Sequence, residues 1–202
     1  MDVKGKLIGL VLAAGRSSRM GKDNKLLLPV GGEPMVARVV RHAMASRLDD
    51  VLVVTGHDGD AVAAALPPGT AYLENPDFAE GMATSLRVGV EALEGARGVM
   101  VLLADMPDVL SEHINWLVAH FADDGVGSIV VAASDVGRGN PVLFAARHFP
   151  ALRAVEGDRG AKSVVEAGGR DVVQVRIGPA AQRDIDTPEA YARLPSSGPK
   201  TS

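Results

Sequence analysis

The sequence predicts an α/β fold in which helices cover both faces of a largely parallel sheet. Two observations predict this class. Short apolar runs, such as residues 7–12 and 98–103, are typical of central strands that are buried on both faces. Segments with apolar residues at helical spacing alternate with these runs, as in successive βαβ units. The 202-residue chain is long enough to bury a sizeable core, and we expect one domain over residues 1–194.

The expected strands are short segments rich in Val, Ile and Leu, bounded by turn residues. Most are followed by a helical pattern, which is the alternation of a parallel sheet. Residues 137–141 contain two glycines and a proline, so we expect a loop there. The strands are expected at residues 7–12, 51–55, 71–74, 98–103, 128–133, 142–145 and 172–177.

The expected helices show apolar residues that recur every three to four positions. In residues 34–46, for example, Val36, Val39 and Val40 share one face. Ser111 is expected to cap another helix, and Thr187 a last one that begins with proline and ends near residue 194. Shorter helices are expected at residues 60–66, after residue 81 and at 161–167, and the Pro-, Ser- and Gly-rich tail 195–202 is expected to be disordered.

Composition narrows the range of functions. Apolar residues make up 47% of the chain and aromatic residues only 3%, so Ala, Val and Leu must build the core. The net charge of −4 and the lack of a long basic stretch argue against a nucleic-acid partner. The absence of cysteine excludes a disulfide, a thiolate metal site and a cysteine nucleophile.

The apolar run near the N-terminus bears on where the protein works. It is too short to cross a bilayer and lacks the layout of a signal peptide. A cleavable signal ending near residues 11–14 is the alternative, but its removal would take away the first strand. We therefore expect a cytoplasmic protein with no membrane partner.

The stretch after the first expected strand suits a polyphosphate. Ala13, Ala14 and Gly15 remove bulky side chains where the strand ends, so backbone N–H groups can approach a ligand closely. Arg19 and Lys25 then add two cations. The spacing matches neither a Walker loop nor the G-x-G-x-x-G fingerprint. The alternative is a surface turn that carries an arginine and a lysine.

Two aspartates follow expected strands and could hold a metal. Ligands of open parallel sheets bind at the carboxyl ends of strands, and Asp105 comes directly after the apolar run 98–103. Mg²⁺ prefers oxygen ligands, commonly one or two carboxylates together with substrate phosphates. Asp186 follows the last expected strand. The alternative for Asp105 is a helix cap or a turn, and Asp184 or Asp186 could simply start a turn.

Three other positions each have two interpretations. Ser85, near the start of an expected helix, can cap that helix or contact a nucleotide base. Residues 157–162 can form an anion-binding turn or a solvated loop. His57 lies in a turn with no second histidine at ligand spacing, so a solvated loop residue is the simpler interpretation.

Several sequence blocks together resemble one family, the MobA-like nucleotidyltransferases related to molybdenum cofactor cytidylyltransferase and guanylyltransferase. The first block is Leu12-Ala13-Ala14-Gly15-x-Ser17-x-Arg19-Met20-Gly21-x3-Lys25. The resemblance implies a Rossmann-like three-layer sandwich of the nucleotide-diphospho-sugar transferase type. The later blocks are Asn75-Pro76, Gly81-Met82-x2-Ser85-Leu86-Arg87, Leu103-Ala104-Asp105-Met106-Pro107, Gly139-Asn140-Pro141-Val142-Leu143-Phe144, Gly157-Asp158-x-Gly160-Ala161-Lys162 and Asp184-Ile185-Asp186-Thr187-Pro188-Glu189.

The resemblance also implies roles for individual residues. Arg19 and Lys25 would hold the triphosphate and, with Asp105, would be catalytic. Asp105 would bind Mg²⁺, with Asp186 as a second ligand. Asn140-Pro141 and residues 158–162 would lie towards the second substrate. The base and ribose would contact the backbone of Leu12, Ala13, Ala14 and Gly15 and the turn that contains Gly81, Met82 and Ser85.

The activity that the resemblance implies is Mg²⁺-dependent transfer of CMP from CTP to a phosphorylated pterin, molybdopterin or molybdenum cofactor, with release of pyrophosphate. Ala13-Ala14-Gly15 resembles the cytidylyltransferase branch, because the guanylyltransferase branch usually has two glycines there. The methyl group of Ala14 would narrow the base pocket towards a pyrimidine. A molybdenum hydroxylase is the partner enzyme that the resemblance implies.

Other functions stay open. The same chemistry could use GTP, or a sugar or alcohol phosphate as acceptor. A protein of another class, a nucleotide sensor or a chaperone for a molybdenum enzyme, would bind nucleotide without releasing pyrophosphate. Three departures from the family pattern, Ala104, Asp108 and Asn140, bear on the acceptor more than on the chemistry.

Overall fold

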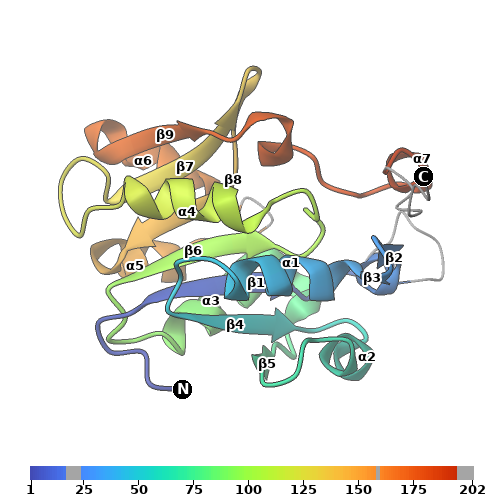
Figure 1. Ribbon diagram of the computed structural model, residues 1–202. Coiled ribbons are helices and arrows are strands. Elements are labelled where there is room, and N and C mark those ends of the chain that lie inside the picture. The colour runs from blue at the N-terminus through green and yellow to red at the C-terminus, as the bar shows by residue number, and fades with distance from the viewer. Residues whose placement is uncertain (17–23, 158–159, 195–202) are drawn as a thin grey trace.

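The computed structural model describes residues 1–16, 24–157 and 160–194, and it confirms the predicted α/β fold (Figure 1). Seven strands form one sheet in the order β5-β4-β1-β6-β8-β7-β9. β8 runs antiparallel to both neighbours, and the other neighbouring strands are parallel. The strands are β1 (Leu7–Ala13), β4 (Asp50–Thr55), β5 (Ala71–Glu74), β6 (Gly98–Leu103), β7 (Ile129–Ser134), β8 (Gly137–Ala145) and β9 (Val172–Arg176).

Helices cover both faces of the sheet, so the fold has three layers (Figure 1). On one face, helices α1 and α4 pack onto the sheet through residues such as Val36 and Leu117. On the other face, α3, α5 and α6 do so through residues such as Leu86 and Leu152. The helices are α1 (Met35–Met44), α2 (Gly59–Ala64), α3 (Met82–Glu91), α4 (Ser111–Ala119), α5 (Phe149–Arg153), α6 (Lys162–Ala167) and α7 (Pro188–Ala192).

The central strand β1 contains the apolar run 7–12 from which a buried strand was predicted. All seven of its residues are buried, because helices cover both of its faces. Leu12 pairs with Leu103 of the parallel strand β6, and the backbone N–H of Ala104 donates to the Leu12 carbonyl at 3.1 Å. The chain therefore leaves β1 and β6 at the same edge of the sheet, which brings Ala14 and Asp105 to one place.

Residues 137–141 are part of a strand, so the predicted loop is wrong. They begin β8, which forms a hairpin with β7 through the pairs Ser134–Gly137 and Ala133–Arg138. The pairing is irregular between these pairs and Val131–Val142, so Pro141, which has no N–H, lies where the ladder is interrupted. Glycine and proline here serve an irregular pairing rather than a loop.

The helix ends also differ in part from the predictions. Ser111 is the first residue of α4 rather than its cap; the cap position is Leu110, whose backbone N–H donates to His113 Nδ1 at 3.2 Å. The His113 imidazole therefore accepts the N–H of the cap residue, as the third helical side chain does in a capping box, whereas the serine was expected to accept an N–H of the first turn. Thr187 does cap α7, since its side chain accepts from the Ala190 N–H, although α7 ends at Ala192. The five-residue helix α5 was not predicted.

The C-terminal segment packs against residues 29–35, which lie far from it in the sequence. A small cluster of Val30, Met35 and Ile185 packs with Tyr191 and Leu194. The Tyr191 hydroxyl donates to the Pro29 carbonyl at 2.7 Å, beside the short hairpin of β2 (Pro29–Val30) and β3 (Glu33–Pro34). Among the described residues, no helix has the length and apolar character needed to span a bilayer. The tail 195–202, predicted to be disordered, lies outside the described residues.

Candidate active site

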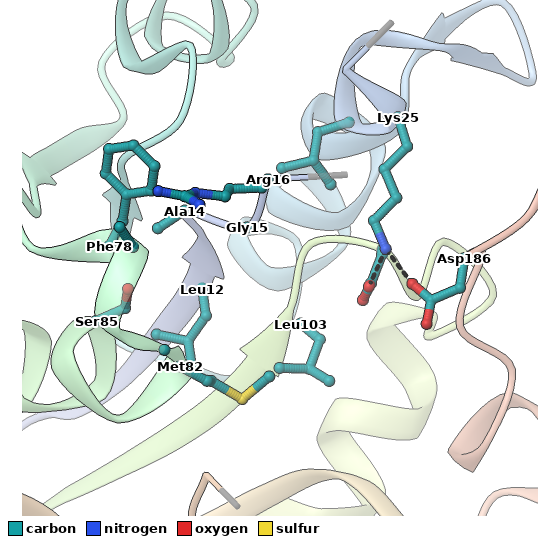
Figure 2. A pocket seen from close by; sticks show the side chains of 14 residues that line it. Leu12, Ala14, Gly15, Arg16, Lys25, Phe78, Met82, Ser85, Leu103 and Asp186 are labelled. Atoms are coloured by element: carbon teal, nitrogen blue, oxygen red, sulfur yellow. Dashed lines mark hydrogen bonds and ion pairs between the residues drawn. The ribbon is translucent and has the colours of Figure 1, made fainter. Parts of the chain in front are cut away.

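A cavity of about 420 Å³ opens at the carboxyl ends of β1 and β6 (Figure 2). Most of the predicted site residues line it, although they come from segments far apart in the sequence. Ala13 does not, because its side chain is fully buried in the core, and Arg19 lies outside the described residues. The predicted residues that line the cavity are Leu12, Ala14, Gly15, Lys25, Gly81, Met82, Ser85, Asp105 and Asp186.

One end of the cavity is charged. Lys25 Nζ donates to Asp105 Oδ2 at 2.7 Å and also to Asp186 Oδ1, so that one ammonium bridges two carboxylates (Figure 2). The Lys25 side chain is only 11% exposed, and those of Asp105 and Asp186 are 20% and 34% exposed. The structure thus brings together three of the four ionic residues that the sequence predicted, and it describes nothing of the fourth, Arg19.

Local structure explains how each of these side chains reaches the cavity. Lys25 is the first residue of the 3-10 turn η2 (Lys25–Leu27), whose N-cap Asn24 accepts from the Leu26 N–H at 3.0 Å. Asp105 lies two residues after Leu103, the last residue of β6. The backbone N–H of Ile185 donates to the Asp105 carbonyl at 2.9 Å, which sets the neighbouring Asp186 beside Asp105.

The electrostatics of this end follow from burial and charge. Burial on its own would lower the pKa of Lys25, but the charges and hydrogen bonds of Asp105 and Asp186 outweigh it and raise that pKa. Lys25 is therefore a cation throughout the physiological range. Burial, together with the charges of Asp186 and Asp105, raises the pKa of Asp184. This region therefore holds more negative charge than Lys25 alone offsets.

One oxygen at this end has hydrogen-bonding capacity left over. Asp105 Oδ1 is buried and has no hydrogen-bond partner among the described residues. A buried carboxylate oxygen without a partner is unfavourable unless something binds it. Within the described part of the chain, no group of three or more His, Cys, Asp or Glu side chains could hold a metal. Among the described residues, Asp105 and Asp186 are the two carboxylates that a cation here would contact, and it would need further ligands.

The other end of the cavity is built around Asn75, which is fully buried. Its Nδ2 donates to Thr84 Oγ1 and to Ser85 Oγ, both at 2.9 Å. The N-cap of α3 is Gly81 and has no side-chain cap, so capping is not what Ser85 does here. Ser85 lines the cavity instead, with its hydroxyl oxygen fixed by Asn75.

Five lining residues were missed by the sequence reasoning, and two of them, Arg16 and Phe78, contact each other; the others are Leu26, Ala79 and Leu103. The Arg16 guanidinium lies over the Phe78 ring, 5.7 Å from its centroid, across the cavity from Lys25 (Figure 2). Phe78 itself packs tightly: a Cβ on Gly56 would lie 2.7 Å from that of Phe78 and 2.8 Å from that of Ala14. The position of Arg16 next to Gly15 was the available signal, but its contact with Phe78 depends on the fold.

The remaining predicted positions lie beside the cavity or away from it. The carbonyl of Gly157 accepts from the Ala83 N–H at 3.1 Å, so this segment starts next to α3; residues 158–159 lie outside the described residues. Asp108 pairs with Arg183 at 2.9 Å, and neither Asp108 nor Asn140 lines the cavity. His57 is 40% exposed and lies 3.4 Å from the Asp58 carboxylate, as expected of a solvated turn residue.

Comparisons with known proteins find one family model and several related proteins that match this chain. The model of the MobA-like NTP transferase domain matches residues 9–173. The purine catabolism protein PucB of Bacillus subtilis is 34% identical over 200 residues, 92% of this chain and 94% of that protein. The nicotine blue oxidoreductase of Paenarthrobacter nicotinovorans is 29% identical over 76% of this chain and 78% of that protein. The structure of Mycobacterium tuberculosis Rv0371c in complex with manganese is 28% identical, with a TM-score of 0.80, and covers 96% of this chain and 100% of its own.

Proposed function

The chain belongs to the MobA-like NTP transferase family and is a nucleotidyltransferase by that membership, and from this premise we propose its substrates. We propose that it transfers CMP from CTP to the terminal phosphate of molybdopterin or the molybdenum cofactor, in the presence of Mg²⁺. The single observation that carries the proposal is the cavity that combines a side-chain-poor strand end with Lys25, Asp105 and Asp186. A polyphosphate needs such a combination of open backbone and buried charge.

The preference for cytosine is supported by the small residue Ala14 at the end of β1 and by Ser85. Ala14 lines the cavity and packs against Gly56, where a Cβ would lie 2.8 Å from the Ala14 methyl group, so this methyl group has a fixed position. A methyl group at this point makes the base pocket narrower than a glycine would. Ser85 accepts its hydrogen bond from Asn75, which leaves the serine hydroxyl hydrogen to donate to a base.

Asp105 and Asp186 fit a hard divalent cation. Both offer carboxylate oxygens, and the buried Asp105 Oδ1 lacks a partner among the described residues. Two carboxylates completed by substrate phosphates are typical of Mg²⁺ sites. The manganese complex of the related Rv0371c supports a divalent cation as well. When bound, such an ion neutralises phosphate charge and polarises the phosphorus that is attacked.

The chain's own residues contribute position and charge. An oxygen of the acceptor's terminal phosphate forms a bond to the α-phosphorus of CTP, the bond from that phosphorus to the bridging oxygen breaks, and pyrophosphate leaves with the electron pair. Lys25 neutralises charge on the phosphates, and Arg16 adds a cation on the opposite wall. No covalent intermediate on the protein is needed, so catalysis comes from orientation and electrostatic stabilisation. Arg19 stays a predicted phosphate ligand from the sequence pattern.

The acceptor and the partner enzyme form the second part of the proposal. A phosphorylated pterin would approach beside the start of α3, where Gly157 contacts Ala83. The product would pass to a molybdenum hydroxylase. The alternatives are GTP as donor, another sugar or alcohol phosphate as acceptor, and a sensor or chaperone that only binds nucleotide. The related nicotine blue oxidoreductase adds a redox alternative, because its name assigns that protein a different class of reaction.

A pyrophosphate-release assay separates these possibilities. The protein is mixed with Mg²⁺, each of the four nucleoside triphosphates in turn and molybdopterin, with sugar and alcohol phosphates as other acceptors. We expect pyrophosphate only with molybdopterin, and fastest with CTP. Faster release with GTP would overturn the cytosine assignment. No release with any pair would favour a binding protein or an oxidoreductase.

A further inference from the structure

The ammonium group of Lys25 lies between the two carboxylates that the proposed function assigns to the metal (Figure 2). Its Nζ donates to Asp105 Oδ2 at 2.7 Å and to Asp186 Oδ1. A lysine ammonium is a compact point charge, and its hydrogen bonds use the same oxygen lone pairs that a metal ion uses. Lys25 and a divalent cation therefore compete for the same two carboxylates, although Lys25 leaves Asp105 Oδ1 unbonded.

Burial makes this competition strong. The Lys25 side chain is 11% exposed, so little water screens its charge from a second cation beside it. A metal that arrives alone must therefore displace the Lys25 ammonium from its hydrogen bonds to Asp105 and Asp186.

We propose that Lys25 holds the metal position until a nucleoside triphosphate arrives, so that metal and nucleotide bind cooperatively. The phosphates offer Lys25 a second set of anionic oxygens within the same cavity. When the ammonium turns to them, Asp105 and Asp186 are released to the metal. Coupling between two ligands is reciprocal, so the metal also strengthens nucleotide binding. The chain thus takes up a metal together with its nucleotide and holds metal weakly between turnovers.

The inference rests on the proposed function for the identity of the nucleotide, but the exchange can be tested without any nucleotide. Mn²⁺ is titrated alone into the full-length protein, and free Mn²⁺ is followed by electron paramagnetic resonance. Lys25→Met, which keeps the length and removes the charge, should bind Mn²⁺ about 10-fold more tightly than the wild type, a usual size for coupling between sites. Lys25→Arg keeps the charge and should bind Mn²⁺ as weakly as the wild type. Equal Mn²⁺ affinity of wild type and Lys25→Met would overturn the proposal.

A second measurement uses the wild type, in case Lys25→Met does not fold. An amine-acetylating reagent labels lysines in the presence and absence of saturating Mn²⁺, and mass spectrometry quantifies each site. Labelling of Lys25 should rise with Mn²⁺, while that of the exposed Lys4 should not change. If Mn²⁺ binds and Lys25 labelling stays the same, the exchange does not occur. Neither result depends on pyrophosphate release, so this inference and the proposed function can fail separately.

Discussion

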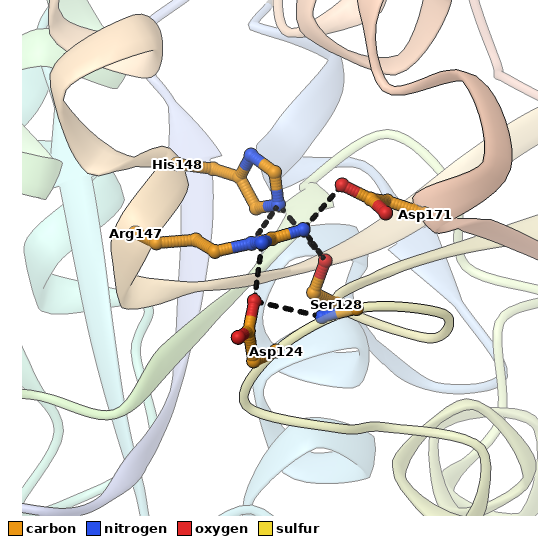
Figure 3. Close-up of polar contacts among 6 residues, drawn as sticks. Asp124, Ser128, Arg147, His148 and Asp171 are labelled. Carbon is orange, nitrogen blue, oxygen red and sulfur yellow. Dashed lines mark hydrogen bonds and ion pairs between the residues drawn. The ribbon is translucent and has the colours of Figure 1, made fainter.

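Two ion clusters in this protein have the same composition, a cation between two aspartates, but they differ in what they can still bind. In the first, Lys25 bridges Asp105 and Asp186. In the second, Arg147 bridges Asp124 and Asp171 (Figure 3). The second cluster ties the end of β8 to the starts of β7 and β9, which suggests a purely structural role.

The second cluster is satisfied by its own neighbours. Arg147 also donates to Ser128 Oγ at 2.8 Å and to His148 Nε2 at 3.3 Å. Ser128 Oγ and His148 Nε2 lie 3.1 Å apart. In the first cluster, by contrast, Asp105 Oδ1 is buried without a partner among the described residues.

Both ion clusters border a cavity, so the presence of a cavity does not distinguish them. The first cluster borders the cavity of about 420 Å³, and the second borders one of about 390 Å³ lined by His148, Asp171 and small side chains. Within the described residues, what differs is the surroundings: the first cluster alone lies at a strand end with small side chains and has an unsatisfied buried carboxylate oxygen. Unused binding capacity, rather than charge or volume, marks the candidate active site.

The two clusters are expected to differ most when one aspartate in each is replaced. Asp105→Asn keeps the shape but removes a charge from the site, so turnover with Mg²⁺ should fall by about 10²-fold or more, as for other electrostatic groups in active sites. The matched change Asp171→Asn in the second cluster should leave kcat and KM within error of the wild type. Steady-state pyrophosphate release and thermal unfolding are measured on both variants. Near-normal turnover of a folded Asp105→Asn would remove this residue from the mechanism.

Removing the two cations should separate activity from stability. Lys25→Ala should lower kcat/KM for the nucleotide by about 10²-fold with a small change in Tm, because water can reach the partly exposed Asp105 and Asp186. Arg147→Ala should lower Tm by about 2–6 °C, because the buried Ser128 loses a donor, and should leave kcat unchanged. The opposite ranking of the two variants would assign the structural role to Lys25.

A smaller effect is expected at the wall opposite Lys25. Arg16→Gln should raise KM for the nucleotide by about 3- to 10-fold with kcat nearly unchanged, since one exposed cation is lost from the binding site. Phe78→Leu keeps the apolar contact but removes the aromatic face, so it should raise KM by a smaller factor. Arg170→Gln, an exposed arginine remote from this cavity, is the control. An unchanged KM in Arg16→Gln would exclude Arg16 from nucleotide binding.

The smallest effect concerns pH and the second cluster. Burial, together with the charge of Arg147, lowers the pKa of His148 from its ordinary value of 6.5. Above 6.5 both folded and unfolded forms are neutral; below it the unfolded chain binds the proton first, so stability falls as pH decreases. His148→Asn should therefore lose less unfolding free energy between pH 7 and 5.5 than the wild type, by about 1 kcal/mol or less. Urea unfolding at both pH values measures the difference, and an equal loss in both proteins would contradict the assignment.

The central strands and the acidic end of the site were predictable from sequence, and the reasons are physical. The strand segment 98–103 matches β6 because an apolar run of this kind between turn residues is typical of a strand buried on both faces. Asp105 was predictable because a carboxylate directly after such a strand must lie at the ligand edge of the sheet.

The parts that were missed depend on tertiary contacts. β8 begins with glycines and a proline: Gly137 pairs with β7, and Gly139 lies so close to Ala181 that a Cβ would be 1.8 Å from its carbonyl oxygen. The stack of Arg16 on Phe78 joins segments that the sequence does not place together. The hydrogen bonds of Lys25 to both aspartates likewise depend on the bond from the Ile185 N–H to the Asp105 carbonyl, which places Asp186 beside Asp105. Sequence spacing shows which residues could meet, but packing decides which ones do.

The most direct test is an anomalous-difference map at the manganese edge, from crystals soaked with MnCl₂ and a non-hydrolysable CTP analogue. A site built by unused carboxylate oxygens predicts a peak bound by Asp105 and Asp186, with Lys25 turned to the phosphates and no peak at Asp124 or Asp171. A nucleotide bound in the cavity with manganese absent from Asp105, or manganese bound in the Arg147 cluster instead, would contradict it.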